Sequence, residues 1–215
     1  MASHSGIQKG PASQSLPVAA LRKPRILVAA CGCLGAAKFG QICCSFAEWA
    51  EVKAVATRAG LFFIDRATIP NGVQFYTDQD EMSSWSRLGD PILHVELRQW
   101  ADIMLIAPLS ANTLAKIAGG LCDNLLTCII RAWDYTKPFF VAPSMHAFQW
   151  RNHFTEHHLM SLDELGIALI PPISTSHMGD HQTGAMASLS TIESAVKVYY
   201  ETRMLLGSSN AKQEV

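Results

Sequence analysis

Short runs of apolar residues alternate along the chain with longer segments in which apolar residues recur every three or four positions. The short runs predict strands at 25–30, 52–57, 102–107, 138–143 and 166–170. The longer segments predict helices at 35–49, 91–100, 110–118, 124–133, 146–162 and 189–206, and a further amphipathic segment at 59–66. Because the strand candidates are apolar throughout, both faces of the sheet are expected to be covered. The alternation predicts a doubly wound α/β domain, with a parallel sheet flanked by helices.

The remaining segments are polar or rich in turn residues, and they delimit the domain. Residues 1–23 are interpreted as a disordered N-terminal tail, 24–206 as a single domain and 207–215 as a C-terminal tail. Inside the domain, residues 71–89 form a polar, turn-rich stretch. A chain of 215 residues fits one medium domain with a sizeable core of its own.

Composition excludes several classes of function. Hydrophobic residues make up 49% of the chain and charged residues 16%, which is too apolar for a disordered protein. The formal net charge of −1 does not favour binding to nucleic acid through bulk charge. No run approaches the roughly 18 uninterrupted apolar residues of a membrane span. We expect a soluble globular protein that binds neither nucleic acid nor a membrane.

The cysteines point to a reducing compartment. Six cysteines, at positions 31, 33, 43, 44, 122 and 128, lie in apolar segments rather than in turn-rich loops. We therefore expect free thiols and a cytoplasmic location. The spacing of the cysteines and histidines does not match a metal site, so no metal is expected. The N-terminal tail contains no acidic residue, which leaves a transit peptide as the alternative to simple disorder.

The loops after the predicted strands carry the candidate chemistry. In doubly wound sheets, ligands bind outside the carboxyl ends of the strands, where the strand order reverses. The first strand is followed by Gly32-Cys33-Leu34-Gly35, in which the glycines allow close approach of the backbone. Ser110 and Thr113 begin a helix, where their hydroxyls either cap the helix or bind a phosphate or a ring edge. Ordinary caps and turns would look the same, but several such loops at one sheet edge favour a nucleotide-like cofactor. The GxGxxG fingerprint of a standard NAD site is absent.

Several long stretches resemble the homo-oligomeric flavin-containing cysteine decarboxylases. The matching stretches are residues 38–40, 46–52, 89–98 and 107–138. Over 25–206 the chain is most similar to plant phosphopantothenoylcysteine decarboxylases of the Hal3 type. The resemblance implies a Rossmann-like (flavodoxin-like) fold, an FMN cofactor held between subunits, and a homotrimer.

The resemblance also implies roles for particular residues. A lone histidine is more often structural, but His94 falls in the family's Gly-Asp-Pro-x-Leu-His segment, which carries the catalytic base. An imidazole there can take or hold a proton at neutral pH. The FMN-binding positions would be Gly32, Cys33, Leu34, Ser110, Ala111, Asn112, Thr113, Ala142 and Met145. The substrate side would include His146, His177, Met178 and Met186, with His146 as a second catalytic residue.

Four segments of the chain depart from the family pattern. His146 replaces the asparagine that holds the substrate carboxylate, and as a cation it could hold that carboxylate through charge. Met178 replaces the cysteine of the substrate flap, and a thioether neither donates a proton nor forms a thiolate. Ala59-Gly60 stands where the family has a serine pair that helps to hold the flavin phosphate, and Cys31-Gly32-Cys33 replaces Ser-Gly-Ser.

These departures leave three hypotheses for the function. The first is an FMN-dependent decarboxylase of a cysteinyl or related carboxylate substrate with altered specificity, using His94 and His146. The second is a genuine phosphopantothenoylcysteine decarboxylase of coenzyme A biosynthesis, either with His177 as a substitute proton donor or in mixed trimers with a paralogue. The third is a non-catalytic regulatory flavoprotein, since some Hal3-type proteins regulate phosphatases.

Overall fold

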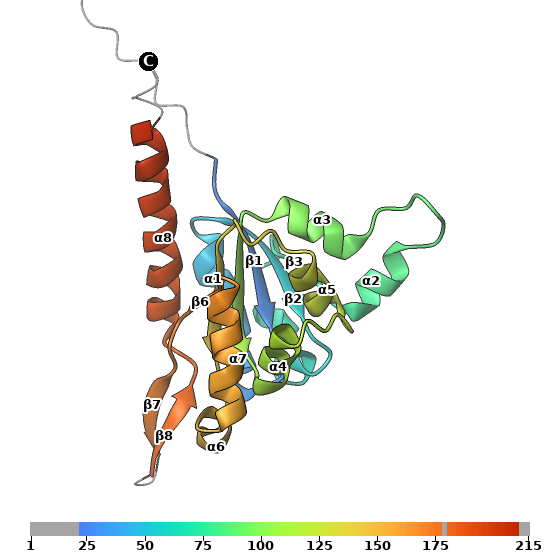
Figure 1. Ribbon diagram of the computed structural model, residues 1–215. Helices are drawn as coiled ribbons and strands as arrows, with labels where there is room; N and C mark the ends of the chain where they lie inside the picture. The colour runs from blue at the N-terminus through green and yellow to red at the C-terminus, as the bar shows by residue number, and fades with distance from the viewer. Residues whose placement is uncertain (1–21, 178–179, 211–215) are drawn as a thin grey trace, which may run out of the picture.

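A six-stranded parallel sheet forms the centre of the protein. The computed structural model describes residues 22–177 and 180–210, and its strands run in the order β3-β2-β1-β4-β5-β6 (Figure 1). The strands are β1 Arg25–Ala30, β2 Glu51–Ala56, β3 Gln74–Tyr76, β4 Ile103–Leu109, β5 Phe139–Pro143 and β6 Ala168–Leu169. The strand order reverses between β1 and β4, which are central neighbours. The predicted doubly wound α/β fold is confirmed.

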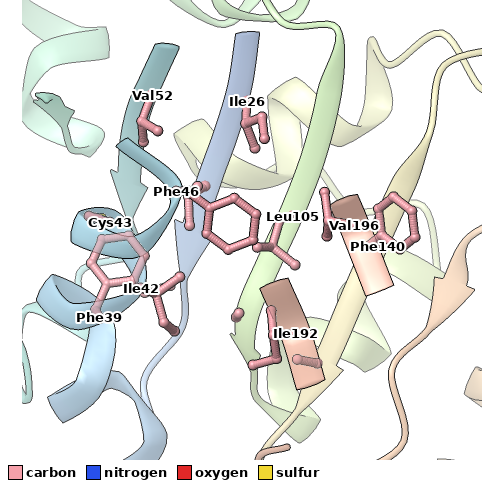
Figure 2. Packing of buried hydrophobic residues seen from close by; sticks show 14 of the residues in the cluster. Ile26, Phe39, Ile42, Cys43, Phe46, Val52, Leu105, Phe140, Ile192 and Val196 are labelled. Carbon is pink, nitrogen blue, oxygen red and sulfur yellow. The ribbon is translucent and has the colours of Figure 1, made fainter. Parts of the chain in front are cut away.

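Helices cover both faces of the sheet. On one face lie α1 (Phe39–Ala47) and α8 (Leu189–Asn210), and on the other α3 (Leu93–Trp100), α4 (Ala111–Ala118), α5 (Leu125–Arg131) and α7 (His153–Glu164). Successive residues of β1 therefore pack into different cores: Ile26 and Val28 face α1 and α8, whereas Leu27 faces the opposite helices. Figure 2 shows Ile26 and Phe46 packed with Leu105 and Val196 in the first of these cores. This two-sided burial explains why β1 is apolar throughout.

Several elements differ from their predicted form. The 35–49 helix begins as a 3-10 helix, η1 (Leu34–Lys38), before α1. The 59–66 segment holds a short 3-10 helix, η2 (Gly60–Phe62), and the first residue of another, η3 (Arg66–Thr68). The 146–162 helix is two helices, α6 (Ala147–Trp150) and α7, because Asn152 caps the second one by accepting the Phe154 N–H.

The polar stretch 71–89 contains regular structure as well. It holds β3 and the helix α2 (Asp78–Ser84), which starts with a capping box between Thr77 and Asp80. Beyond β6, β7 (Ile173–His177) and β8 (Asp180–Ala185) form an antiparallel pair. Helix α8 ends at Asn210, four residues later than the expected end of the domain at 206. In the described part of the chain, no helix is long and apolar enough to cross a membrane.

Gly40 permits the close packing of α1 against η3. A Cβ built at Gly40 would overlap the side chain of Thr68, whereas a Cβ at Gly72 would meet nothing within 4 Å. We expect Gly40→Ala to lower the free energy of unfolding by about 1–3 kcal/mol, although alanine is the better helix former. Gly72→Ala is the matched control and should be neutral or slightly stabilising. Urea unfolding at equal protein concentration compares them, and equal stability of the two variants would contradict the prediction.

Candidate functional site

A cavity of about 660 Å³ lies at the carboxyl ends of β1, β4 and β5. Its walls are the loop after β1, the start of α4, the loop after β5, and the ends of β7 and β8. It occupies the switch point of the sheet, where doubly wound folds bind their ligands. Its volume is within the range of about 300–1,000 Å³ that is typical of small-molecule sites.

Most of the predicted cofactor residues line this cavity. They are Gly32, Cys33, Leu34, Ser110, Ala111, Asn112 and Met145. Thr113 and Ala142 do not line it, because Thr113 is buried beneath Ser110 and Ala142 is buried within β5. On the substrate side, His146 and Met186 line the cavity. His177 belongs to β7, and Met178 lies outside the described residues.

Gly32 and Gly35 line the cavity, and both are also needed for close contacts with neighbouring segments. A Cβ at Gly32 would overlap the Cβ of Ala59 in the loop after β2. A Cβ at Gly35 would lie 2.9 Å from the Ser144 Oγ and 3.1 Å from the Pro108 Cβ. The two glycines therefore allow the loops after β1, β2 and β5 to pack together with the end of β4 and to form one edge of the cavity.

The Cys-Gly-Cys loop provides neutral thiols. Burial raises the pKa of the Cys31 thiol to about 11. Burial also raises the pKa of Cys33, although hydrogen bonds with the Ser144 hydroxyl and with the backbone of Gly35 and Ala36 act in the opposite direction. Both groups are therefore protonated at neutral pH, and Cys33 presents to the cavity an S–H group rather than a thiolate.

His146 caps the short helix α6 from the cavity wall. Its Nδ1 accepts the Phe148 backbone N–H at 3.3 Å, and its own backbone N–H donates to Gln149 Oε1 at 3.2 Å. An Nδ1 that accepts a hydrogen bond carries no proton, so the hydrogen-bond network assigns the proton of a neutral ring to Nε2. In this geometry, Nε2 is the ring nitrogen that can donate a hydrogen bond to a ligand.

His94 lies away from the cavity, at the start of α3. Its backbone N–H donates to Glu81 Oε2 at 3.1 Å, and its Nδ1 lies 2.6 Å from Glu81 Oε1. His94 is absent from the cavity wall, so within one chain the structure does not bring it together with His146. Large apolar side chains are exposed near the end of α2, at Met82, and on the segment that joins α2 to α3, at Trp85, Leu88 and Ile92. Leu34, which lines the cavity, and Phe62, the neighbour in sequence of the lining residue Phe63, are also more than 80% exposed.

Sequence reasoning missed several residues of the cavity wall, above all Lys38. Among the described residues that line the cavity, Lys38 carries a positive charge and none is an aspartate or a glutamate. The cavity therefore suits an anionic ligand. Lys38 follows Gly35 by one helical turn and belongs to a stretch that resembles the family, which was the available signal.

A second cavity, of about 630 Å³, lies between α7 and the edge of the sheet at β5 and β6. It contains Glu156, Asp163 and Glu164 but only one cation, Arg151. The excess of carboxylates disfavours a phosphate or carboxylate ligand. None of the predicted site residues lines this cavity, so the candidate site is the one at the switch point.

Comparisons with known proteins agree with this site. Residues 15–199 match the Flavoprotein family, and the chain belongs to that family. It is 60% identical over 195 residues to phosphopantothenoylcysteine decarboxylase HAL3 of Malus domestica, covering 90% of this chain and 91% of the relative. It is 62% identical over 183 residues to phosphopantothenoylcysteine decarboxylase of Arabidopsis thaliana, covering 85% and 88%.

Solved structures show the same relationship. The FMN-binding protein AtHal3 superposes with a TM-score of 0.82 and 62% identity, over 84% of this chain and 98% of the other. A PPC decarboxylase mutant complexed with pantothenoylaminoethenethiol gives the same TM-score and identity, over 84% and 100%. These findings confirm the predicted family and fold, and they support FMN as the cofactor.

Gly32 provides a test of the cavity. We expect Gly32→Ala to push the loop after β1 away from Ala59 and to lower the FMN content several-fold, since a small displacement disrupts a preorganised site. Flavin absorbance per subunit of the purified protein is the measurement, with circular dichroism as the check on folding. Gly72→Ala again serves as the control. Full FMN occupancy in Gly32→Ala would show that this loop contact does not shape the flavin site.

Proposed function

We propose that the protein is an FMN-dependent carboxy-lyase that decarboxylates a cysteinyl or related carboxylate substrate. FMN would occupy the cavity at the switch point, and His94 of a neighbouring subunit would complete the site. The observation that carries this proposal is the separation of His94 from the cavity. His94 does not line the cavity of its own subunit, and it lies beside exposed apolar side chains that a neighbouring subunit could cover.

The cavity fits FMN in size and chemistry. Lys38 and the absence of carboxylates among the described lining residues suit the flavin phosphate, and the Asn112 amide can donate to and accept from a ring edge. The proposed cofactor residues also include Thr113 and Ala142, which lie behind the wall. Bound there, FMN would supply the two-electron acceptor that no side chain offers.

The remaining steps fall to side chains of this protein. The Nε2–H of His146 would donate to the substrate carboxylate and hold it until carbon dioxide leaves. His94 would accept the proton that the substrate loses, because a neutral imidazole can act as a general base. Met186 and Ile173 line the cavity where β7 and β8 approach it, and they would exclude water from the reacting groups.

The two exposed apolar regions favour a closed ring of subunits. One region lies on the segment between α2 and α3, and the other beside the cavity at Leu34 and Phe62. Contact between two different patches gives a heterologous interface, which closes into a ring when the rotation allows it. We propose a homotrimer, as the family resemblance implies.

Complementation tests whether the site is shared. We expect His94→Asn to retain FMN but lose decarboxylation, and His146→Ala to lose activity as well. In oligomers formed from both variants at equal amounts, about one quarter of the sites would combine an intact cavity with an intact neighbouring His94. Activity near one quarter of the wild-type value is therefore expected after co-expression.

Two outcomes would contradict the shared site. Inactive mixed oligomers would place both histidines in the same subunit's site, and full turnover by His94→Asn alone would assign the base to another residue. Light scattering checks that both variants assemble.

A second candidate is phosphopantothenoylcysteine decarboxylation itself. It is favoured by the relatives of 60% and 62% identity, which carry that name. His177 would then replace the missing proton donor, or a paralogue would supply the asparagine and cysteine in mixed trimers. If neither His177 nor a paralogue compensates for the missing asparagine and cysteine, the protein would be a non-catalytic regulatory flavoprotein, which is the remaining alternative.

The product distinguishes these candidates. If Met178 has replaced a required reducing cysteine, the wild-type protein should convert phosphopantothenoylcysteine, at most once per site, to an unsaturated thiol. Met178→Cys combined with His146→Asn should restore the saturated product over many turnovers, and neither single change should suffice because the two groups act as a unit. Mass spectrometry measures the difference of two hydrogens. Steady formation of the saturated thiol by the wild type would favour the second candidate, and an inactive double variant with bound FMN would favour a different substrate.

A further inference from the structure

We propose that Glu81 is the positioning residue for His94, and that it holds the ring in the tautomer with a free Nε2. This inference rests on the proposed role of His94 as the base and deepens it. It names a residue in α2, thirteen positions before His94, to which the sequence analysis gave no role.

Both carboxylate oxygens of Glu81 contact His94. Oε2 accepts the backbone N–H at 3.1 Å, and Oε1 lies 2.6 Å from Nδ1 of the ring. An ionised carboxylate only accepts hydrogen bonds, so Nδ1 must carry a proton. In the neutral ring, Nε2 then has the lone pair and is available as a base. The two contacts also fix the ring relative to its own backbone.

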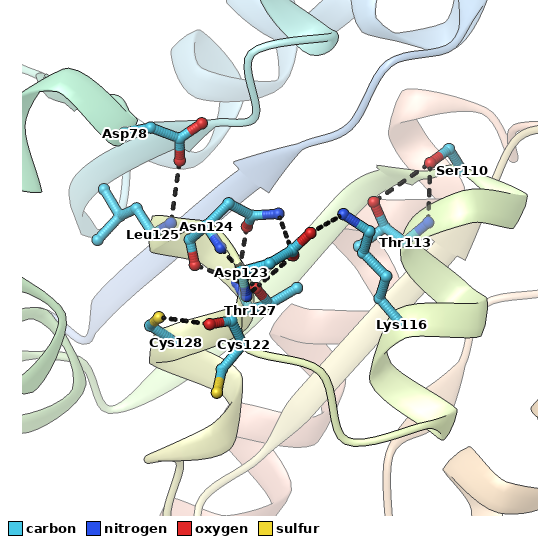
Figure 3. Close-up of polar contacts among 10 residues, drawn as sticks. All are labelled: Asp78, Ser110, Thr113, Lys116, Cys122, Asp123, Asn124, Leu125, Thr127 and Cys128. Atoms are coloured by element: carbon cyan, nitrogen blue, oxygen red, sulfur yellow. Dashed lines mark hydrogen bonds and ion pairs between the residues drawn. The ribbon is translucent and has the colours of Figure 1, made fainter.

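Glu81 is itself held in place through α2. Asp78, one helical turn before Glu81, accepts the Leu125 backbone N–H at the start of α5 at 2.9 Å (Figure 3). Residues three positions apart lie on the same side of a helix, so Asp78 and Glu81 both face α3 and α5. The Leu125 contact therefore ties the position of Glu81 to the packed helices.

The other acidic residues of α2 have separate partners. Asp80 accepts from the Thr77 backbone N–H and hydroxyl, both at 2.7 Å, and completes the capping box. Asp78 binds α5 as described above. Of the three acids in the first turn, Glu81 is thus the one whose contacts go to His94. Its side chain is 21% exposed and that of His94 is 25% exposed, so the pair is shielded from water without being buried.

Replacement of Glu81 by glutamine removes the charge at nearly constant size. The glutamine amide can donate to Nδ1, which would favour the tautomer with the proton on Nε2 and so block the base. We expect Glu81→Gln to lower kcat about 10- to 100-fold with KM and FMN content unchanged. Glu96→Gln, the same change at an exposed site of α3, is the matched control and should leave kcat unaffected. Glu81→Asp, which keeps the charge but is one methylene shorter, should recover part of the loss.

Nitrogen NMR of the His94 ring provides a readout that does not depend on turnover. In the wild type, the neutral ring should carry its proton on Nδ1, and in Glu81→Gln the population should shift towards Nε2–H. Assignment of the signals uses His94→Asn. A wild-type ring with its proton on Nε2, or an unchanged kcat in Glu81→Gln, would overturn the proposal. A third outcome separates the two proposals. If the tautomer shifts as expected but His94→Asn has normal turnover, Glu81 does position the ring, and the proposed role of His94 as the base is wrong.

Discussion

The close packing of the loops at the carboxyl ends of β1, β2, β4 and β5 is the constraint on which the site depends. Gly32 lies against Ala59 and Gly35 against Ser144, with no room for a side chain at either glycine. These contacts bring the loop after β1 close enough to the start of α4 to share one cavity with Ser110 and Asn112. The location of the cavity follows from the reversal of strand order between β1 and β4, and its shape follows from the two glycines.

The elements that could be predicted from the sequence are those whose signal is local. β1 and β4 are apolar on both faces, and that pattern alone placed them correctly in a covered parallel sheet. Helix α2 was missed because it is polar, and it is stabilised by its capping box and by the contact of Asp78 with α5. The break between α6 and α7 was missed although Asn152 is a good capping residue, because the surrounding apolar spacing looked continuous.

Part of the site could be predicted because it lies on loops that directly follow strands. Loops after strands are recognisable once the strands are known, so Ser110 and Asn112 could be assigned to the sheet edge where the cavity lies. Glu81 could not, since its contact with His94 depends on how α2 packs against α3. The separation of His94 from His146 does not follow from the residue pattern, because sequence distance does not reveal which surface of the fold each occupies; only the family resemblance, which implies a site shared between subunits, pointed to it.

The two histidines are held in opposite states by their surroundings. Nδ1 of His94 faces a carboxylate, which leaves Nε2 with a lone pair, whereas Nδ1 of His146 accepts a backbone N–H, which leaves Nε2 with a proton. In neutral form, one ring is therefore arranged as a proton acceptor and the other as a donor. A site in decline would lose such supporting contacts first, because they contribute little to folding on their own. Here Glu81 contacts His94 and Gln149 contacts His146, although positions 146 and 149 both depart from the family pattern, and this argues for a changed substrate rather than an abandoned site.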